Sequence, residues 1–175
     1  MRSVTFLRNA SLAVGLLLLA SSSLMADTRR PGAIEQSKPA AAATTGGDAC
    51  TLLTKPDAEA AVGGPVGEGK ATNMNSGGHA AKACAYDGAG GRHIQLNMFV
   101  FAPGSAEIQV YRGLCAKKEQ VAGLGDIACW YNEKHRELQM LKGGTVMTIE
   151  ISRSGDATDA LKAVGKKVVD RAPAK

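Results

Sequence analysis

Hydrophobic positions divide the chain into three regions of different pattern. Near the N-terminus, Arg2 and Arg8 stand before a continuous apolar run over residues 10–20. Residues 27–48 consist mainly of Ala, Thr, Gly, Pro and charged residues, with almost nothing to bury. From residue 49 onward, apolar residues recur at the spacings of strands and helices. A folded domain is therefore expected only in the third region.

Strands are predicted where apolar and polar residues alternate. The clearest alternation is in residues 93–101, where Ile94, Leu96 and Met98 share one face. A glycine pair at 143–144, flanked by two such segments, is the signature of a tight hairpin. The other expected strands cover residues 66–73, 80–87, 127–132, 137–142 and 145–151.

Three helices are predicted from caps and from three- and four-residue spacing. The first covers residues 55–62, where Thr54 can cap the start and Gly63-Gly64 ends the helix. The second runs from Ser105 to about Glu119. Its residues at this spacing are Ile108, Tyr111, Leu114, Cys115 and Lys118.

The last helix starts at Asp156 as N-cap and ends near Arg171. It would bury Leu161, Val164 and Val168. Gly165 lies beside this stripe, which indicates close packing on the sheet.

The resulting order is α-β-β-β-α-β-β-β-α. This order predicts an α+β fold with a mostly antiparallel sheet and the helices packed on one side of it. Residues 49–172 are long enough for one hydrophobic core and too short for two, so a single domain is expected.

The N-terminal region has the charged, apolar and polar parts of a signal peptide, with cleavage expected after Ala26. A membrane anchor is the alternative, but about 20 apolar residues are needed to span the hydrocarbon, and this run is roughly half that. A lipoprotein would need a cysteine directly after the apolar run, and the first is Cys50. Residues 27–48 are expected to be a disordered tether. The mature protein should then be periplasmic or secreted, with no membrane span.

Charge and aromatic content argue against nucleic acid as a partner. The net charge is +5, and removal of Arg2 and Arg8 leaves +3 on the mature chain. The remaining Lys and Arg are mixed with acidic residues, and aromatic residues make up only 4% of the sequence. A nucleic-acid binder would need a clustered basic surface and aromatics for stacking.

Four cysteines, at positions 50, 84, 115 and 129, indicate two disulfides in an oxidising compartment. Three pairings are possible. Cys115 on the apolar face of a helix and Cys129 on the following strand can meet, which favours that bridge. A thiol redox or metal site is the alternative, but there is no C-x-x-C pair and no tight Cys/His cluster.

No motif with a known chemistry has the context that it needs. GPVGEGK at residues 64–70 has the spacing of a phosphate-binding loop, but Ala71 stands where that loop needs Ser or Thr. A hydrolase would need Ser and His to converge in the fold, since no G-x-S-x-G elbow is present. A copper or zinc site is a further alternative. Its candidate ligands are His79, His93, His135, Met74, Met98, Met140 and Met147.

Trp130, the only tryptophan, alternates with Cys129 and Tyr131 on its strand. If Cys129 points toward the helices, Trp130 lies on the open face of the sheet, where large aromatics often mark contact surfaces. Arg92, His93 and Gln95 would extend that surface. The alternative is that a loop or the tether covers Trp130.

Several segments resemble a family of bacterial secreted and lipoprotein envelope domains of unknown function. They are DACTLLTKPDAEAAVGGPVG at 48–67, CAY at 84–86, VAGLGDIACW at 121–130 and the last amphipathic helix. The resemblance implies a bridge between Cys50 and Cys84 and a fold similar to the PsbP-like α/β/α sandwich. The chain departs from the family in lacking a lipobox cysteine and in having the pair Cys115 and Cys129. The family implies no reaction and no catalytic residue.

Taken together, these features predict a non-catalytic, exported envelope module without a cofactor. Its partner would be an envelope protein or a small ligand, which the sequence does not identify. A periplasmic copper or zinc handling protein is the alternative, and a hydrolase is the third.

Overall fold

The computed structural model describes residues 48–173. In chain order its elements are α1 (Ala49–Leu52), α2 (Lys55–Val62), β1 (Lys70–Ser76), β2 (His79–Asp87), the 3₁₀ turn η1 (Ala89–Gly91), β3 (His93–Val100), α3 (Ala106–Cys115), β4 (Ile127–Trp130), β5 (Glu137–Lys142), β6 (Thr145–Ser152) and α4 (Thr158–Arg171). The α+β class is confirmed, and α1 is an addition to the predicted order. The predicted signal peptide and residues 27–47 of the predicted tether lie outside the described residues.

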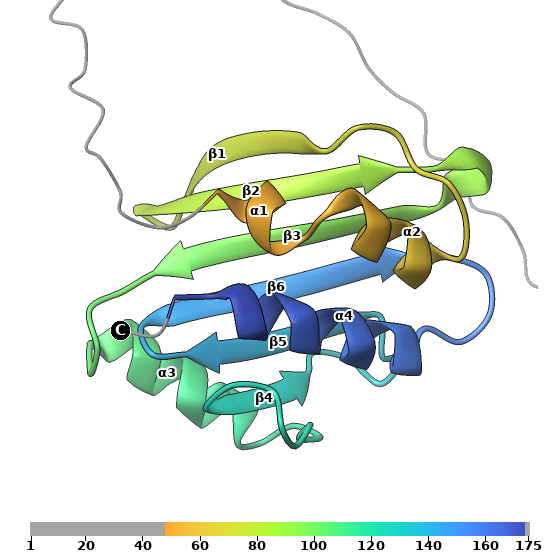
Figure 1. Ribbon diagram of the computed structural model, residues 1–175. Helices are drawn as coiled ribbons and strands as arrows, with labels where there is room; N and C mark the ends of the chain where they lie inside the picture. The colour runs from red at the N-terminus through yellow and green to blue at the C-terminus, as the bar shows by residue number, and fades with distance from the viewer. Residues whose placement is uncertain (1–47, 174–175) are drawn as a thin grey trace, which may run out of the picture. The chain divides into compact units, whose positions relative to one another are not determined.

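Six strands form one sheet in the order β1-β2-β3-β6-β5-β4, and each neighbouring pair is antiparallel (Figure 1). The predicted bounds of β3, β5 and β6 agree with the structure to within one residue. β1 begins four residues later than predicted. Its hairpin turn is made by Gly77 and Gly78, both with positive φ, which are the backbone angles that a two-residue turn requires.

The main core lies between one face of the sheet and the helices α1, α2 and α4, which cover that face in Figure 1. Leu96, Leu138 and Leu161 are fully buried there. The predicted close packing at Gly165 is confirmed, because a Cβ at this position would lie 2.8 Å from Leu138 Cδ2.

The helix α3 packs on the opposite face of the sheet, so the prediction of helices on one side only is wrong. Its residues Ile108, Tyr111 and Cys115 form a second, smaller core with Cys129, Leu141 and Val146. Those three strand residues alternate with Trp130, Met140 and Met147, which belong to the main core. Because side chains alternate between the two faces of a strand, the two clusters lie on opposite faces.

The helix α3 is also shorter than predicted, because residues after Cys115 leave it to cover the outer edge of β4. The backbone N–H of Trp130 donates to the carbonyl of Glu119 at 2.9 Å. The N–H of Val121 donates to Ala128 at the same distance. α4 begins at Thr158 rather than Asp156, whose carboxylate accepts the Thr158 N–H at 2.9 Å.

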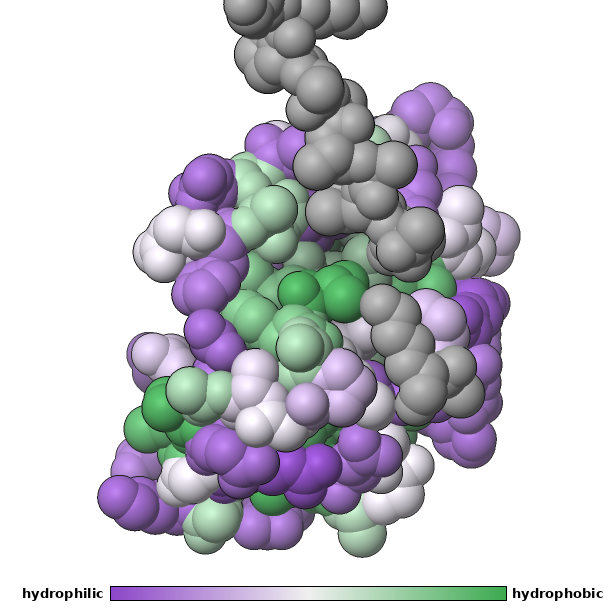
Figure 2. Space-filling view, turned by 90° about the vertical axis from the view of Figure 1, so that its left-hand side faces the viewer, coloured by the Kyte–Doolittle hydropathy of each residue, from purple (hydrophilic) through white to green (hydrophobic). Residues whose placement is uncertain are grey.

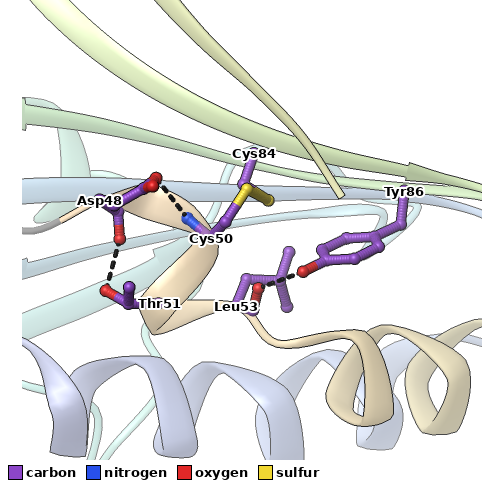
Figure 3. Close-up of a disulfide and its surroundings, with 6 residues drawn as sticks. All are labelled: Asp48, Cys50, Thr51, Leu53, Cys84 and Tyr86. Carbon is purple, nitrogen blue, oxygen red and sulfur yellow. Dashed lines mark hydrogen bonds between the residues drawn. A yellow bond between two sulfur atoms is a disulfide. The ribbon is translucent and has the colours of Figure 1, made fainter. Parts of the chain in front are cut away.

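One disulfide joins α1 to β2. It links Cys50 and Cys84, with Cα atoms 5.0 Å apart (Figure 3). The Asp48 carboxylate accepts the Cys50 N–H at 3.0 Å and caps α1. The Tyr86 hydroxyl donates to the Leu53 carbonyl at 2.9 Å, as Figure 3 also shows. The segment before α2 is therefore held to the sheet by one covalent bond and one buried hydrogen bond.

The second disulfide links Cys115 of α3 to Cys129 of β4, with Cα atoms 5.6 Å apart. This is the pairing that the helix and strand positions favour, and Cys50–Cys84 is the pairing that the family resemblance implies. The bridged cysteines are 14 residues apart in Cys115–Cys129 and 34 residues apart in Cys50–Cys84. In the chain-entropy view, closing the shorter loop stabilises the fold by about 3 kcal/mol and closing the longer one by about 4 kcal/mol.

A buried carboxylate connects α2 to α4. Asp57 is 4% exposed and accepts hydrogen bonds from Arg171 at 2.5 Å and Lys167 at 2.9 Å. The Thr54 hydroxyl also donates to Asp57, at 2.6 Å, so Thr54 does not cap α2 through its side chain as predicted. Burial alone would raise the pKa of Asp57, but the hydrogen bonds from Arg171, Thr54 and Lys167 hold it well below its usual range.

Candidate ligand-binding groove

The surface predicted around Trp130 is not present. Trp130 is 3% exposed and belongs to the main core, so its prediction as an open-face residue is wrong. Cys129 does point toward a helix, as expected, but that helix is α3, on the opposite face from the other three. The ring of Trp130 is stacked on His135, with centroids 4.6 Å apart.

The other three residues of that predicted surface lie far from Trp130 in the strand order. Arg92, His93 and Gln95 are at or near the start of β3, and β6 and β5 separate β3 from β4. His93 Nδ1 lies 2.7 Å from a carboxylate oxygen of Asp87. Gln95 donates to the Asn97 side chain at 2.7 Å.

A groove of about 680 Å³ lies beside α3, between this helix and the open face of the sheet. Its lining is mostly apolar and aromatic, with polar groups toward its ends. The residues are His79, Phe99, Phe101, Ala106, Glu107, Val110, Tyr111, Leu114, Lys118, Tyr131, Gln139 and Val146. A groove of this size and composition is typical of a site for a small ligand.

The helix presents large apolar side chains to the groove rather than to the core. Val110 is 62% exposed and Leu114 is 55% exposed. Leu114 was expected on the same buried stripe as Cys115, but only Ile108, Tyr111 and Cys115 are buried in α3. Val110 and Leu114 are four residues apart and therefore form a second apolar stripe along the helix.

The two ends of the groove carry different groups. At one end, His79 packs edge-on against Phe101 with ring centroids 5.2 Å apart, and His79 Nε2 lies 3.9 Å from Glu107. At the other end, Lys118 Nζ lies 4.5 Å from the ring centroid of Tyr131 and donates to the Tyr131 carbonyl at 2.6 Å. Tyr131 is 49% exposed.

One exposed apolar residue of β3 lies outside the groove. Val100, the last residue of β3, is 36% exposed. Figure 2 looks at the side of the molecule where β3 ends, and hydrophobic residues gather in the middle of that view between hydrophilic margins.

Tyr111 is the unusual member of the lining. It is 9% exposed, and its hydroxyl is buried with no hydrogen-bond partner. Leaving a buried polar group without a partner costs about 1–3 kcal/mol. Burial also raises the pKa of this hydroxyl far above its usual range, so it remains a hydrogen-bond donor at physiological pH.

The candidate metal ligands do not gather. His79, His93 and His135 lie in three separate places, and Met98, Met140 and Met147 are in the main core. His135 Nε2 lies 2.8 Å from a Glu119 oxygen. Within residues 48–173, no group of three His, Cys, Asp or Glu side chains is placed to hold a metal ion.

Comparison with known proteins gives no relative. No family model, no curated protein and no solved structure matches the chain. In the part of the chain that the structure describes, no helix is long and apolar enough to cross a membrane. The function must therefore be argued from the groove and the sequence alone.

Proposed function

We propose that this chain is a non-catalytic, exported module of the bacterial cell envelope that binds its ligand in the groove beside α3. The observation that carries the proposal is the groove itself, about 680 Å³ in volume and lined mainly by apolar and aromatic side chains. Single exposed apolar residues are common on protein surfaces, but apolar surface that is contiguous and concave marks interaction sites.

Export is supported by the pattern of residues 1–26 and by the disulfides. Two disulfides among 126 residues are typical of secreted and periplasmic proteins, because cytosolic thiols are kept reduced. Membership of the secreted and lipoprotein envelope family is part of the same proposal. The helix layers on both faces of the sheet support it, since a sandwich with helices outside is what the resemblance implies.

The proposal is tested with N-phenylnaphthylamine, a neutral dye that fluoresces when it enters an apolar site. The full chain, produced in an oxidising compartment, should bind the dye with saturation at one site. Leu114→Arg should weaken binding about tenfold or more, because it places a long charged side chain in the groove. Leu114 is half-exposed, so the variant should fold as the parent does.

Val100→Arg is the matched control. Val100 is also a large, partly exposed apolar residue, but it does not line the groove. Its replacement should leave dye binding unchanged. Equal loss in both variants, or no saturable binding by the parent chain, would rule out the groove as the binding site.

A further inference from the structure

We propose that the occupant of the groove is a small, mainly hydrophobic molecule that carries a hydrogen-bond acceptor such as a carbonyl oxygen, and that the Tyr111 hydroxyl donates to this acceptor. The inference rests on the proposed function and specifies its ligand class.

A buried hydroxyl without a partner, such as that of Tyr111, is rare. Buried polar atoms in native proteins almost always have a partner, so each exception needs an explanation. Among residues 48–173, three buried side-chain atoms lack one: Arg92 Nε, Ser105 Oγ and Tyr111 Oη. Of these residues, only Tyr111 lines the groove. The unpartnered donor and the exposed apolar side chains Val110 and Leu114 therefore belong to the same site.

The core around this hydroxyl gives it no partner. Tyr111 packs in the smaller core with Ile108, Leu141, Val146 and the Cys115–Cys129 disulfide. Those side chains offer no strong hydrogen-bond acceptor. No acceptor among the described residues bonds this hydroxyl, and the groove that Tyr111 lines is the route by which an acceptor from outside the chain would reach this side chain.

A protein partner and a small molecule would use this part of the molecule differently. A protein partner on the exposed stripe of α3 would cover Val110 and Leu114. A small molecule would instead fill the groove itself, which the side chain of Tyr111 lines. The volume of about 680 Å³ lies within the range of small-molecule sites. Phe99, Val146 and Leu114 would contact the apolar body of such a molecule, and Tyr111 would orient it.

The test uses two probes of nearly equal shape, acetylnaphthalene and ethylnaphthalene. Only the first has a carbonyl oxygen. Each competes with N-phenylnaphthylamine on the full chain. The parent should bind acetylnaphthalene about tenfold more tightly than ethylnaphthalene, which is the factor that one hydrogen bond supplies in an apolar site.

Tyr111→Phe removes only the hydroxyl. It should abolish the preference for acetylnaphthalene and leave the affinity for ethylnaphthalene unchanged. The variant should also melt no lower than the parent, because the hydroxyl it loses has no partner. Tyr86→Phe is the matched control: its hydroxyl is bonded to Leu53 away from the groove, so the preference should persist.

The outcomes separate this inference from the proposed function. Saturable binding of both probes without a preference in the parent, or an unchanged preference in Tyr111→Phe, would overturn the role of the hydroxyl and leave the groove as a binding site. Failure of the dye and both probes to bind would overturn the groove as a site and this inference with it.

Discussion

Tyr86 and Tyr111 show that residue type does not determine whether a buried hydroxyl has a hydrogen-bond partner. Both are buried between the sheet and a helix, yet the Tyr86 hydroxyl is bonded to the Leu53 carbonyl and the Tyr111 hydroxyl has no partner. The difference arises because the carbonyl of Leu53, at the end of α1, accepts from Tyr86, whereas the core residues that pack around Tyr111 are apolar. Which hydroxyl is satisfied is a property of tertiary packing, so the sequence could not indicate Tyr111 as a site residue.

Asp57 gives a prediction at the residue scale. Its pKa in the folded protein lies below the value of about 3.9 expected for the unfolded chain. The unfolded state therefore takes up the proton first as pH falls, and the stabilisation present above about pH 4 is lost below it. Asp57→Asn should lower the free energy of unfolding at pH 7 by about 1–3 kcal/mol. It should also flatten the dependence of stability on pH between about 2 and 4.

Asp170→Asn provides the comparison. Asp170 is paired with Lys166 one turn earlier on α4, at 3.0 Å, but its side chain is 61% exposed. Exposed pairs of this kind contribute little, so the variant should follow the parent curve. Urea denaturation at a series of pH values measures the free energy of unfolding of the parent and of the two variants. The role assigned to Asp57 would be contradicted if the free energy of unfolding of the parent does not decrease as the pH is lowered from 4 to 2. An equal effect of the two variants would also contradict it.

At the scale of elements, the sequence predicts what local pattern determines. Alternation and the Gly143-Gly144 turn locate β3, β5 and β6, and the stripe of Leu161, Val164 and Val168 locates α4. The face on which each helix packs is not a local property. The apolar stripe of α3 predicts which side of the helix is buried. It does not predict on which face of the sheet the helix packs. For this reason the sequence pattern predicts Trp130 on the open face, whereas it is buried in the main core.

The groove was missed for a related reason. The spacing of Val110 and Leu114 is visible in the sequence as a second apolar stripe on α3, beside that of Ile108, Tyr111 and Cys115. A helix with apolar residues over so wide an arc needs either two packing partners or a ligand. That signal could have indicated an exposed apolar surface, but not its volume or its lining from β3 and β5.

Two helical glycines give a paired prediction for α3 and α4. Nothing lies within 4 Å of where a Cβ on Gly113 would be, so Gly113→Ala should stabilise the protein by about 0.5–1 kcal/mol through reduced backbone entropy. A Cβ on Gly165 would lie 2.8 Å from Leu138 Cδ2 and 3.1 Å from Met140 Sδ, both in the packed core. Gly165→Ala should therefore cost about 1 kcal/mol or more despite the same gain in helix propensity.

Thermal melting of the two variants beside the parent measures these changes. Shifts of opposite sign support close contact between α4 and β5 at Gly165. A stabilised Gly165→Ala variant would mean that the Leu138 and Met140 side chains move aside without cost.

At the scale of the whole molecule, the two disulfides tie both ends of the sheet to helices on opposite faces. Cys50–Cys84 holds α1 to β2 near one edge, and Cys115–Cys129 holds α3 to β4 at the other. Together they stabilise the fold by roughly 7 kcal/mol in the chain-entropy view, which is of the order of a small domain's whole stability. Stability of this kind depends on an oxidising compartment.

The proposed export would therefore precede stable folding, and this gives the last prediction. The apolar run before Ala26 is about half the length that a membrane span needs, and Arg2 and Arg8 stand before it, so a signal peptidase should release the chain. The protein should be expressed from its full sequence in a bacterial host with an oxidising periplasm. Mass spectrometry should then give the mass of a chain that begins near Asp27. Unreduced digestion should yield two linked peptides, one for each disulfide. A mass that includes residues 1–26, or free thiols in the periplasmic protein, would refute an exported module with two disulfides. Additional mass from a lipid would show that the module is anchored to a membrane.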